Sequence, residues 1–335
     1  MGFDLFSLIA GLLLIIKGGD WFVAAAVRLA EFLKMPRVVI GSTLVSLATT
    51  TPELVVSLMA GAKGESGLAV GNAVGSCICN IGLILGVTAC IRSVELHPKT
   101  LRRPLAVMIG AGLLLLLFTW NLRIERWQGV LLIAAGAIYF VWDFLHHLRR
   151  RSLSELVEAT ALEQSMERRF IWLHSKLGTA CQFLGGAGVV IIGSRLLVDG
   201  AVIIAQALGV PSLVIGLTIV AIGTSLPELV TAVTSSRQAV SDLAVGNVIG
   251  ANIANLTLIV GAASVIQAVK IDRVTQLFHF PTMLAVMGLI LWKLASDRRL
   301  GRRDGIILIA SYILYLSAVA GLAFFLREAP AAVTG

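Results

Sequence analysis

Apolar and polar positions along this chain separate into long blocks, with apolar runs divided by short segments that carry charge. Each run is close to the roughly 20 residues that a helix needs to cross a bilayer. The pattern therefore predicts an all-α polytopic membrane protein with ten transmembrane helices. The expected spans are residues 3–33, 37–62, 67–91, 103–120, 127–147, 178–209, 212–236, 242–267, 278–296 and 303–326.

Composition agrees with this pattern. Hydrophobic residues make up 57% of the 335 and charged residues 14%, whereas soluble domains carry about 25% charged residues. The lipid bilayer is thus the expected main partner of the chain. The first residues, MGFD, place no basic region before the first apolar run, so we expect that run to be a retained helix and not a cleaved signal.

The net charge of +8 reflects topology. Of the 27 Lys and Arg residues, 19 lie in or beside the segments after odd-numbered spans, six lie on the other side, and Lys17 and Arg195 lie within spans. Positive loops stay in the cytoplasm. Both termini are therefore expected outside and the 148–177 loop inside, and no nucleic-acid partner is expected.

An internal repeat is plain in the sequence. Residues 41–86, GSTLVSLATTTPELVVSLMAGAKGESGLAVGNAVGSCICNIGLILG, align without gaps with residues 216–261, GLTIVAIGTSLPELVTAVTSSRQAVSDLAVGNVIGANIANLTLIVG. Twenty of 46 positions are identical, including polar and proline positions that shared apolar composition would not match. The chain therefore contains a duplication.

The repeat divides the chain into two halves of five spans. We expect a first five-helix unit over 1–147, a linker over 148–177 and a second unit over 178–335. Because five is odd, the second unit enters the membrane from the opposite side, which makes the halves inverted repeats. Transporters with this design place their site near the midplane, on interrupted helices. In the linker, Ser152 and Glu155 have capping-box spacing and predict a short amphipathic helix.

The sequence Pro-Glu occurs in the middle of spans two and seven, at Pro52-Glu53 and Pro227-Glu228. Proline has no N–H, so it leaves a carbonyl one turn earlier without its helical partner. Carboxylate, hydroxyl and carbonyl oxygens without nitrogen or sulfur ligands suit a hard cation such as calcium or sodium. The neighbouring hydroxyls belong to Thr49, Thr50, Thr224 and Ser225.

Structural explanations compete with this one. Proline often only kinks a membrane helix, and Ser or Thr often bonds back to its own helix. Two acidic residues at symmetric depths favour function, because each costs about 2.5–3.5 kcal/mol at the membrane centre. Asn72 and Asn247 follow glycines at close-packing spacing, and they either line the site or only bridge helices.

Redox and zinc chemistry are not indicated. The four cysteines fall inside apolar spans, where they are expected as buried packing residues, and the five histidines show no ligand spacing. No prosthetic group is expected.

The two Pro-Glu stretches, with GNAVGSCICN and GNVIGANIAN, resemble the α-repeats of the cation/calcium exchanger superfamily, particularly its prokaryotic sodium/calcium exchanger branch. The resemblance implies a prokaryotic inner or plasma membrane location, and long first and sixth spans that slide across the core. It implies Glu53 and Glu228 as the central carboxylates for Ca²⁺ and Na⁺. The other implied ligands are the side chains of Thr49, Thr50, Thr224, Ser225, Ser76 and Asn80 and the backbone carbonyls of Ser46 and Ala221.

The chain departs from the family pattern at several positions. Ala48 and Thr51 replace the usual glycine and leucine, and Ala251 replaces a serine. Asn255, the remaining candidate metal ligand, stands where prokaryotic and potassium-dependent members often have aspartate. The loss of that charge argues against potassium as a co-substrate and leaves one sodium site open. The linker is too short for inserted calcium-sensing domains.

The expected function is secondary active antiport, with Ca²⁺ exchanged for Na⁺ by alternating access at the two-glutamate site. The alternative keeps the fold and couples Ca²⁺ or another divalent cation to H⁺, because a carboxyl in a dry site can carry a proton. A passive channel and an intramembrane hydrolase fit less well, since the repeat lies within one chain and no span has a histidine at its middle. One chain holds both repeats, so a functional monomer is expected. Lys17, Asp20, Arg195 and Asp199 receive no role.

Overall fold

The computed structural model describes residues 2–62, 66–149, 175–207 and 221–328. Within them, eight helices are long and apolar enough to cross a membrane, or nine if the bent pair Arg37–Thr49 and Thr51–Leu58 forms one span. They match nine of the ten predicted spans. The tenth, 212–236, begins outside the described residues, as does nearly all of the linker with its predicted helix.

The helices follow the predicted spans closely, because the apolar runs set their lengths. Those of the first half are α1 (Gly2–Leu33), α2 (Arg37–Ile40), α3 (Ser46–Thr49), α4 (Thr51–Ala62), α5 (Ser66–Cys79), α6 (Gly86–Ile91), α7 (Pro98–Phe118) and α8 (Arg126–Arg149). Those of the second are α10 (Lys176–Ala207), α12 (Ala221–Thr224), α13 (Leu226–Arg237), α14 (Ser241–Ala254), α15 (Val260–Ile266), α16 (Phe280–Ala295) and α17 (Arg302–Glu328). The π-helical turns are η1 (Gly41–Val45), η2 (Asn80–Leu85), η5 (Asn255–Ile259) and η6 (Thr275–His279).

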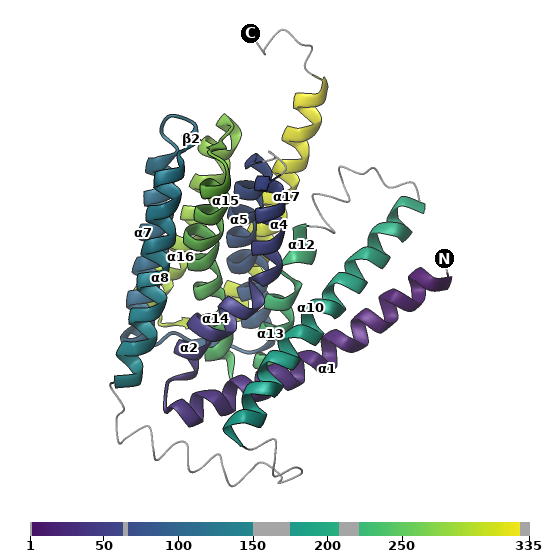
Figure 1. Ribbon diagram of the computed structural model, residues 1–335, viewed down its shortest axis with the longest axis vertical. Helices are drawn as coiled ribbons and strands as arrows, with labels where there is room; N and C mark the ends of the chain where they lie inside the picture. Colours follow the sequence, from purple (N-terminus) through teal and green to yellow (C-terminus); the bar gives the residue numbers. More distant parts are fainter. Residues whose placement is uncertain (1, 63–65, 150–174, 208–220, 329–335) are drawn as a thin grey trace.

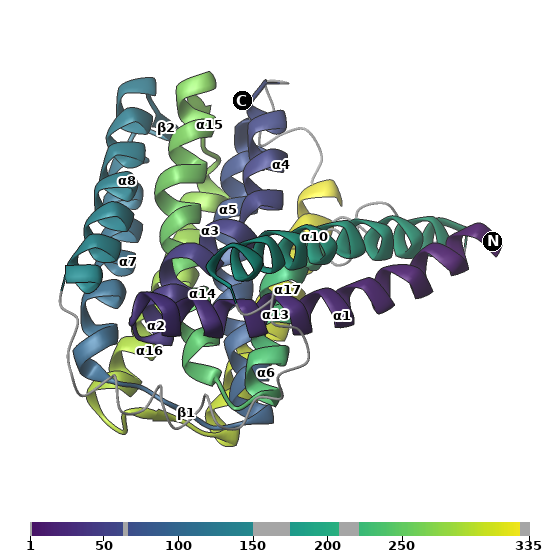
Figure 2. The ribbon, with the colours of Figure 1, turned by 60° about the horizontal axis from the view of Figure 1, so that its bottom comes forward.

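Two helices stand apart from the bundle. α1 and α10 lie side by side and cross it obliquely, and one end of the pair extends beyond it (Figures 1 and 2). The rings of Phe22 and Phe183 pack between them at a tilt of 38°, with centroids 4.7 Å apart. The four charges without a predicted role, Lys17, Asp20, Arg195 and Asp199, are exposed on this pair.

Two short strand pairs join the halves. β1 (Val94–Glu95) pairs with β4 (Arg299–Leu300), and β2 (Arg123–Ile124) pairs with β3 (Val269–Lys270), both antiparallel. β3 follows β1 by 175 residues, and β4 follows β2 by 176. The second pairing is therefore the first with the halves exchanged, as a two-fold relation requires.

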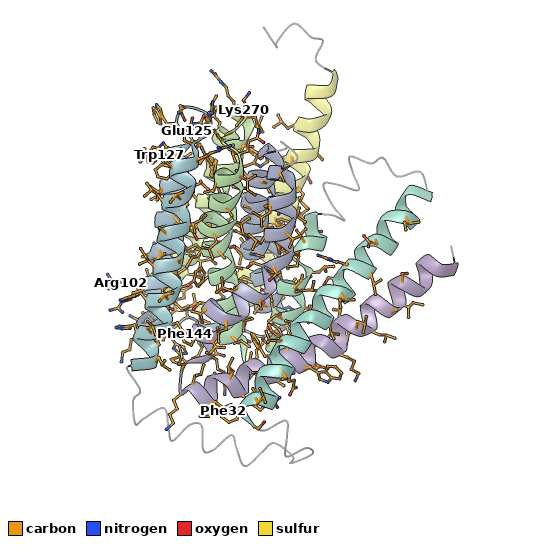
Figure 3. The ribbon with its side chains drawn as sticks, in the orientation of Figure 1. Phe32, Arg102, Glu125, Trp127, Phe144 and Lys270 are labelled. Atoms are coloured by element: carbon orange, nitrogen blue, oxygen red, sulfur yellow. The ribbon has the colours of Figure 1, made fainter. Side chains whose placement is uncertain are left out.

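The two strand pairs help to mark the ends of the bundle. Figure 3 shows Glu125, Trp127 and Lys270 at the end that carries β2, and Arg102 toward the other end. Trp127 is exposed, as expected for an aromatic residue at a membrane interface.

α14 is the centre of the fold. Its residues are buried almost without exception, and it contacts α2, η1, α3, α5, α7 and α13. A helix apolar enough to be enclosed on every side must place its polar residues against partners. Cys77 and Cys79 are buried as predicted, but Cys90 is half-buried and Cys181 is exposed on α10, since one face of α10 is left uncovered.

Candidate functional site

Both Pro-Glu segments interrupt a helix at equivalent residues. α3 ends before Thr50 (φ −79°, ψ 5°), and α13 begins after Ser225 (φ −91°, ψ 11°). The proline is the second residue of the new helix in each case, a position where its missing N–H costs nothing. The helix is therefore interrupted at each proline, and Arg37–Thr49 and Thr51–Leu58 meet at a bend of 42°.

The two glutamates lie in the first turns of these new helices. Glu53 and Glu228 are each 0% exposed, and they interact electrostatically with one another. The positive end of a helix dipole favours a carboxylate in this position. A helix N-terminus supplies only part of a charge, however, so two buried carboxylates still require a cation or protons.

Ser225 links elements from both repeats. Its Oγ donates to Oε1 of Glu53 at 3.2 Å and lies 3.3 Å from Oγ of Ser76 on α5. Ser225 precedes α13 and has the spacing to Glu228 of a capping box, yet its side chain makes no capping bond. The hydroxyl is used between the repeats instead.

A second link joins α3 to α14. Oγ1 of Thr49 donates to Oδ1 of Asn247 at 3.1 Å and lies 3.3 Å from the carbonyl of Ser46. Thr50 donates to the same Ser46 carbonyl at 2.7 Å. Ser46, Thr49 and Thr50 are all buried, so these hydroxyls and carbonyls lie in the interior, as the sequence predicts.

The two π-helical turns η2 and η5 begin at equivalent asparagines, Asn80 and Asn255. Such turns occur frequently at functional sites. Nδ2 of Asn80 donates to Oδ1 of Asn252 on α14 at 2.9 Å, whereas neither side-chain polar atom of Asn255 has a hydrogen-bond partner.

Buried polar atoms without partners concentrate here. Among the described residues, 13 buried side-chain nitrogen or oxygen atoms have none, and seven of them belong to Glu53, Glu228, Asn80, Asn247 and Asn255. Five of the seven are oxygens, including both carboxylate oxygens of Glu228. Such an excess of acceptors is unfavourable without a cation or proton donors.

Other predicted residues lie differently. Asn72 is half-buried and donates to Ser57 of α4 at 3.1 Å, which corresponds to the helix-bridging alternative. Thr224 is half-buried at the end of α12. Ala221 begins α12, and its side chain lies outside the described residues. In the described part of the chain, no three His, Cys, Asp or Glu side chains are placed to hold a metal, so any cation here relies on hydroxyl, amide and carbonyl oxygens as well.

Comparison with known proteins decides the family. The family described as "Sodium/calcium exchanger protein" matches residues 3–145 and again 179–321. This chain belongs to that family. The sodium/calcium exchanger MaX1 of Methanosarcina acetivorans is 30% identical over 342 residues, which cover 92% of this chain and 96% of MaX1. The inner membrane protein YrbG of Escherichia coli is 34% identical over 325 residues, covering 96% and 98%.

A solved structure of the sodium-calcium exchanger NCX_Mj, soaked with Na⁺ and Sr²⁺, gives a TM-score of 0.80 at 30% identity, covering 94% of this chain and 98% of that chain. The chain is thus a membrane-embedded member of the sodium/calcium exchangers, and its resemblance to the prokaryotic branch is confirmed. Cation/calcium exchange is the general activity that these comparisons support.

Sequence reasoning missed one polar residue of this exchanger's interior. Asn252 is 0% exposed and contacts Asn80, yet the repeat comparison passes over it because Cys77 stands at the equivalent position. The signal was present, since an amide inside an apolar span needs a partner.

Proposed function

We propose that this protein is a secondary active antiporter that exchanges Ca²⁺ for Na⁺ at a midplane site built around Glu53 and Glu228. One observation carries the proposal. Two glutamates from equivalent positions of the two repeats are both fully buried, and three of their four carboxylate oxygens have no hydrogen-bond partner. The hydroxyls, amides and carbonyls of the neighbouring predicted ligands extend this oxygen set.

Charge balance explains why such a site would exchange and not leak. One Ca²⁺ neutralises two carboxylates, and so do two Na⁺. An empty site keeps two uncompensated charges in a dry interior, at an effective penalty of several kcal/mol for each ion. The occupied protein would therefore change conformation more readily than the empty one, and the movement of one ion would require the return of the other.

The fold supports alternating access about this site. The exchanged strand pairings β1·β4 and β2·β3 fit inverted repeats over 1–147 and 178–335, with ten spans in total. The oblique pair α1·α10 crosses the bundle beside the interrupted helices and contacts α13, so its sliding would expose either side. We place both termini outside and the 148–177 loop in the cytoplasm, in a functional monomer.

Coupling to H⁺ is the second candidate. It is favoured by Glu228, because neither of its oxygens accepts a hydrogen bond and a proton would neutralise it as well as a sodium ion does. Ala251 also leaves the second repeat one hydroxyl short of the first, which has Ser76 at the equivalent position, and Asn255 stands where the family often has an aspartate.

Reconstitution tests both candidates. The purified protein in liposomes would be given radioactive Ca²⁺ under an imposed Na⁺ gradient, and then under a proton gradient. We expect Na⁺-driven uptake that Glu53→Gln and Glu228→Gln each abolish. Uptake driven only by protons would replace Na⁺ by H⁺, and uptake that survives either substitution would refute the two-glutamate site. Flux without dependence on any counter-gradient would indicate a channel.

A further inference from the structure

Both polar atoms of the Asn252 side chain have partners in the centre of the molecule. Its Nδ2 lies 3.4 Å from the backbone carbonyl of Cys77 and 3.6 Å from Sδ of Met108. Its Oδ1 accepts from Nδ2 of Asn80 at 2.9 Å. The side chain thus joins α14 of the second repeat to the end of α5 and the start of η2 in the first.

These contacts fix the orientation of the Asn252 amide and, through it, that of the Asn80 amide. A backbone carbonyl only accepts hydrogen bonds, so the amide nitrogen of Asn252 must face Cys77 and its oxygen must face Asn80. An oxygen only accepts as well, so Asn80 must turn its nitrogen toward Asn252. Oδ1 of Asn80 is then directed away from Asn252, and it is buried without a partner.

Asn80 lies on the helix face that approaches Glu53. Asn80 follows Ser76 by four residues, a spacing that places both on one helix face. Ser76 contacts Ser225, which donates to Glu53. The amide oxygen that Asn252 leaves free is therefore one turn from the groups that surround Glu53.

The equivalent pair in the other repeat holds its amide more weakly. Asn255 corresponds to Asn80, and Cys77 corresponds to Asn252. A thiol is a weak donor and a weak acceptor, and the Cys77 thiol itself lies 3.8 Å from the carbonyl of Asn252. The Cys77 thiol is also the side-chain partner of Asn255, but neither amide atom of Asn255 makes a hydrogen bond of normal geometry, so its orientation is fixed less firmly.

We propose that Asn252 is a positioning residue that holds the Asn80 amide with its oxygen free to coordinate the transported Ca²⁺. The inference rests on the proposed function, because it assigns a ligand orientation within that site. It also gives the repeats unequal parts, with an oriented amide ligand at Asn80 and an adaptable one at Asn255.

A double-mutant cycle on the full chain tests the inference. Calcium binding to the purified protein in Na⁺-free detergent would be measured for Asn80→Ala, Asn252→Ala and the double variant. Met108→Leu is the matched control, because it removes the other side-chain contact of Asn252 and keeps the volume. Thermal unfolding in the same detergent reports separately on folding.

Each single substitution is expected to weaken Ca²⁺ binding about tenfold, the effect of losing one hydrogen-bonded or charge-assisted contact. The double variant should bind within about twofold of Asn80→Ala, since Asn252 acts only through Asn80. The proposal would be overturned if the two losses of affinity multiplied in the double variant. It would also be overturned if Asn252→Ala bound Ca²⁺ normally and merely unfolded at a lower temperature. Met108→Leu should bind normally, and a loss there equal to that of Asn252→Ala would also overturn it.

Asn252→Asp keeps the test decisive if the alanine variant does not fold. A protonated carboxyl can donate to the Cys77 carbonyl and accept from Asn80, as the amide does, so it should retain Ca²⁺ affinity to within about threefold. Affinity as low as that of Asn80→Ala would contradict the proposal. Glu53→Gln distinguishes a failure of the proposed function from a failure of this inference. If the unsubstituted chain binds no Ca²⁺, the proposed function fails. If Glu53→Gln abolishes binding and Asn252→Ala does not weaken it, only this inference fails.

Discussion

Gly246 and Gly250 of the second repeat correspond to Gly71 and Gly75 of the first, but their surroundings differ. A Cβ atom on Gly246 would collide with the carbonyl of Val38, and one on Gly250 with the carbonyl of Ser42. No described atom lies within 4 Å of a Cβ placed on Gly71 or Gly75. Matching glycines are thus tightly covered in one half and uncovered by described residues in the other.

The paired asparagines show the same difference. Asn247 is fully buried and accepts a hydrogen bond from Thr49, whereas Asn72 is half-buried and donates to Ser57. Identical residues at equivalent positions therefore have different partners. The repeat specifies which groups are available, and the packing of α2 and η1 against α14 selects the contacts that form. Equivalent positions of the two repeats therefore have different contacts among the described residues, which do not include 208–220, the counterpart of much of α2 and η1.

The largest expected effect comes from adding a methyl group to each of these glycines. Gly246→Ala and Gly250→Ala would press against backbone atoms, and we expect destabilisation of about 3 kcal/mol or more. Gly71→Ala and Gly75→Ala meet no such backbone atom among the described residues, so a smaller loss is expected, offset in part because alanine is the better helix former. Apparent melting temperatures in detergent measure the difference. Equal losses in all four variants would mean that the halves are packed alike.

A second prediction concerns transport in the stable variants. If alternating access exchanges the surroundings of the two halves, Gly75 reaches the crowded position that Gly250 has here. We expect Gly75→Ala to fold normally and to slow Na⁺-driven Ca²⁺ uptake about tenfold, which corresponds to about 1.4 kcal/mol on the barrier. Uptake at the normal rate would show that the first repeat does not close in this way. Gly110→Ala, at an open position on α7, is the matched control.

Removing the hydroxyls that pair with Asn247 and Asn72 should give a smaller difference in stability than the glycine substitutions do. Thr49→Val leaves the buried oxygen of Asn247 without its donor, which costs about 1–3 kcal/mol. Ser57→Ala leaves Asn72 half-buried with access to other partners, and about 0.5–1 kcal/mol is expected. Thermal unfolding without Ca²⁺ compares the two variants. A larger loss of stability for Ser57→Ala would mean that the Ser57–Asn72 contact, and not the Thr49–Asn247 contact, is the more stabilising of the two.

Much of this arrangement could be read from the sequence, for reasons that are local. The spans follow from apolar length, and the breaks at Thr50 and Ser225 follow from Pro52 and Pro227. The choice of partners could not be read, because Asn72 and Asn247 are indistinguishable in sequence context and differ only in what packs against them. Asn252 shows the same limit, since its role depends on meeting Asn80 from the other repeat. The two-residue strands are likewise too short to leave a pattern.

The last comparison lies outside the membrane-spanning segments, where Asp272 and His97 precede equivalent helices. Asp272 accepts from the N–H of Thr275 at 2.7 Å and from its hydroxyl at 2.8 Å, whereas His97 makes no side-chain cap at α7. Partial burial tends to raise the pKa of Asp272, but the hydrogen bonds from Thr275 outweigh it and the pKa lies below its usual range.

A carboxyl whose pKa falls on folding stabilises the protein above its usual pKa, and that contribution is lost as pH falls through the folded value. Asp272→Ala should therefore cost about 1 kcal/mol at neutral pH, with the difference shrinking below about pH 4. His97→Asp should add a cap at the other helix and stabilise by about 0.5–1 kcal/mol with the same pH dependence. Melting temperatures across pH 3–7 test both. If the loss of stability in Asp272→Ala did not change with pH, the carboxylate would not be the group that caps the helix. The starts of the two equivalent helices would then not differ in the way the hydrogen bonds indicate.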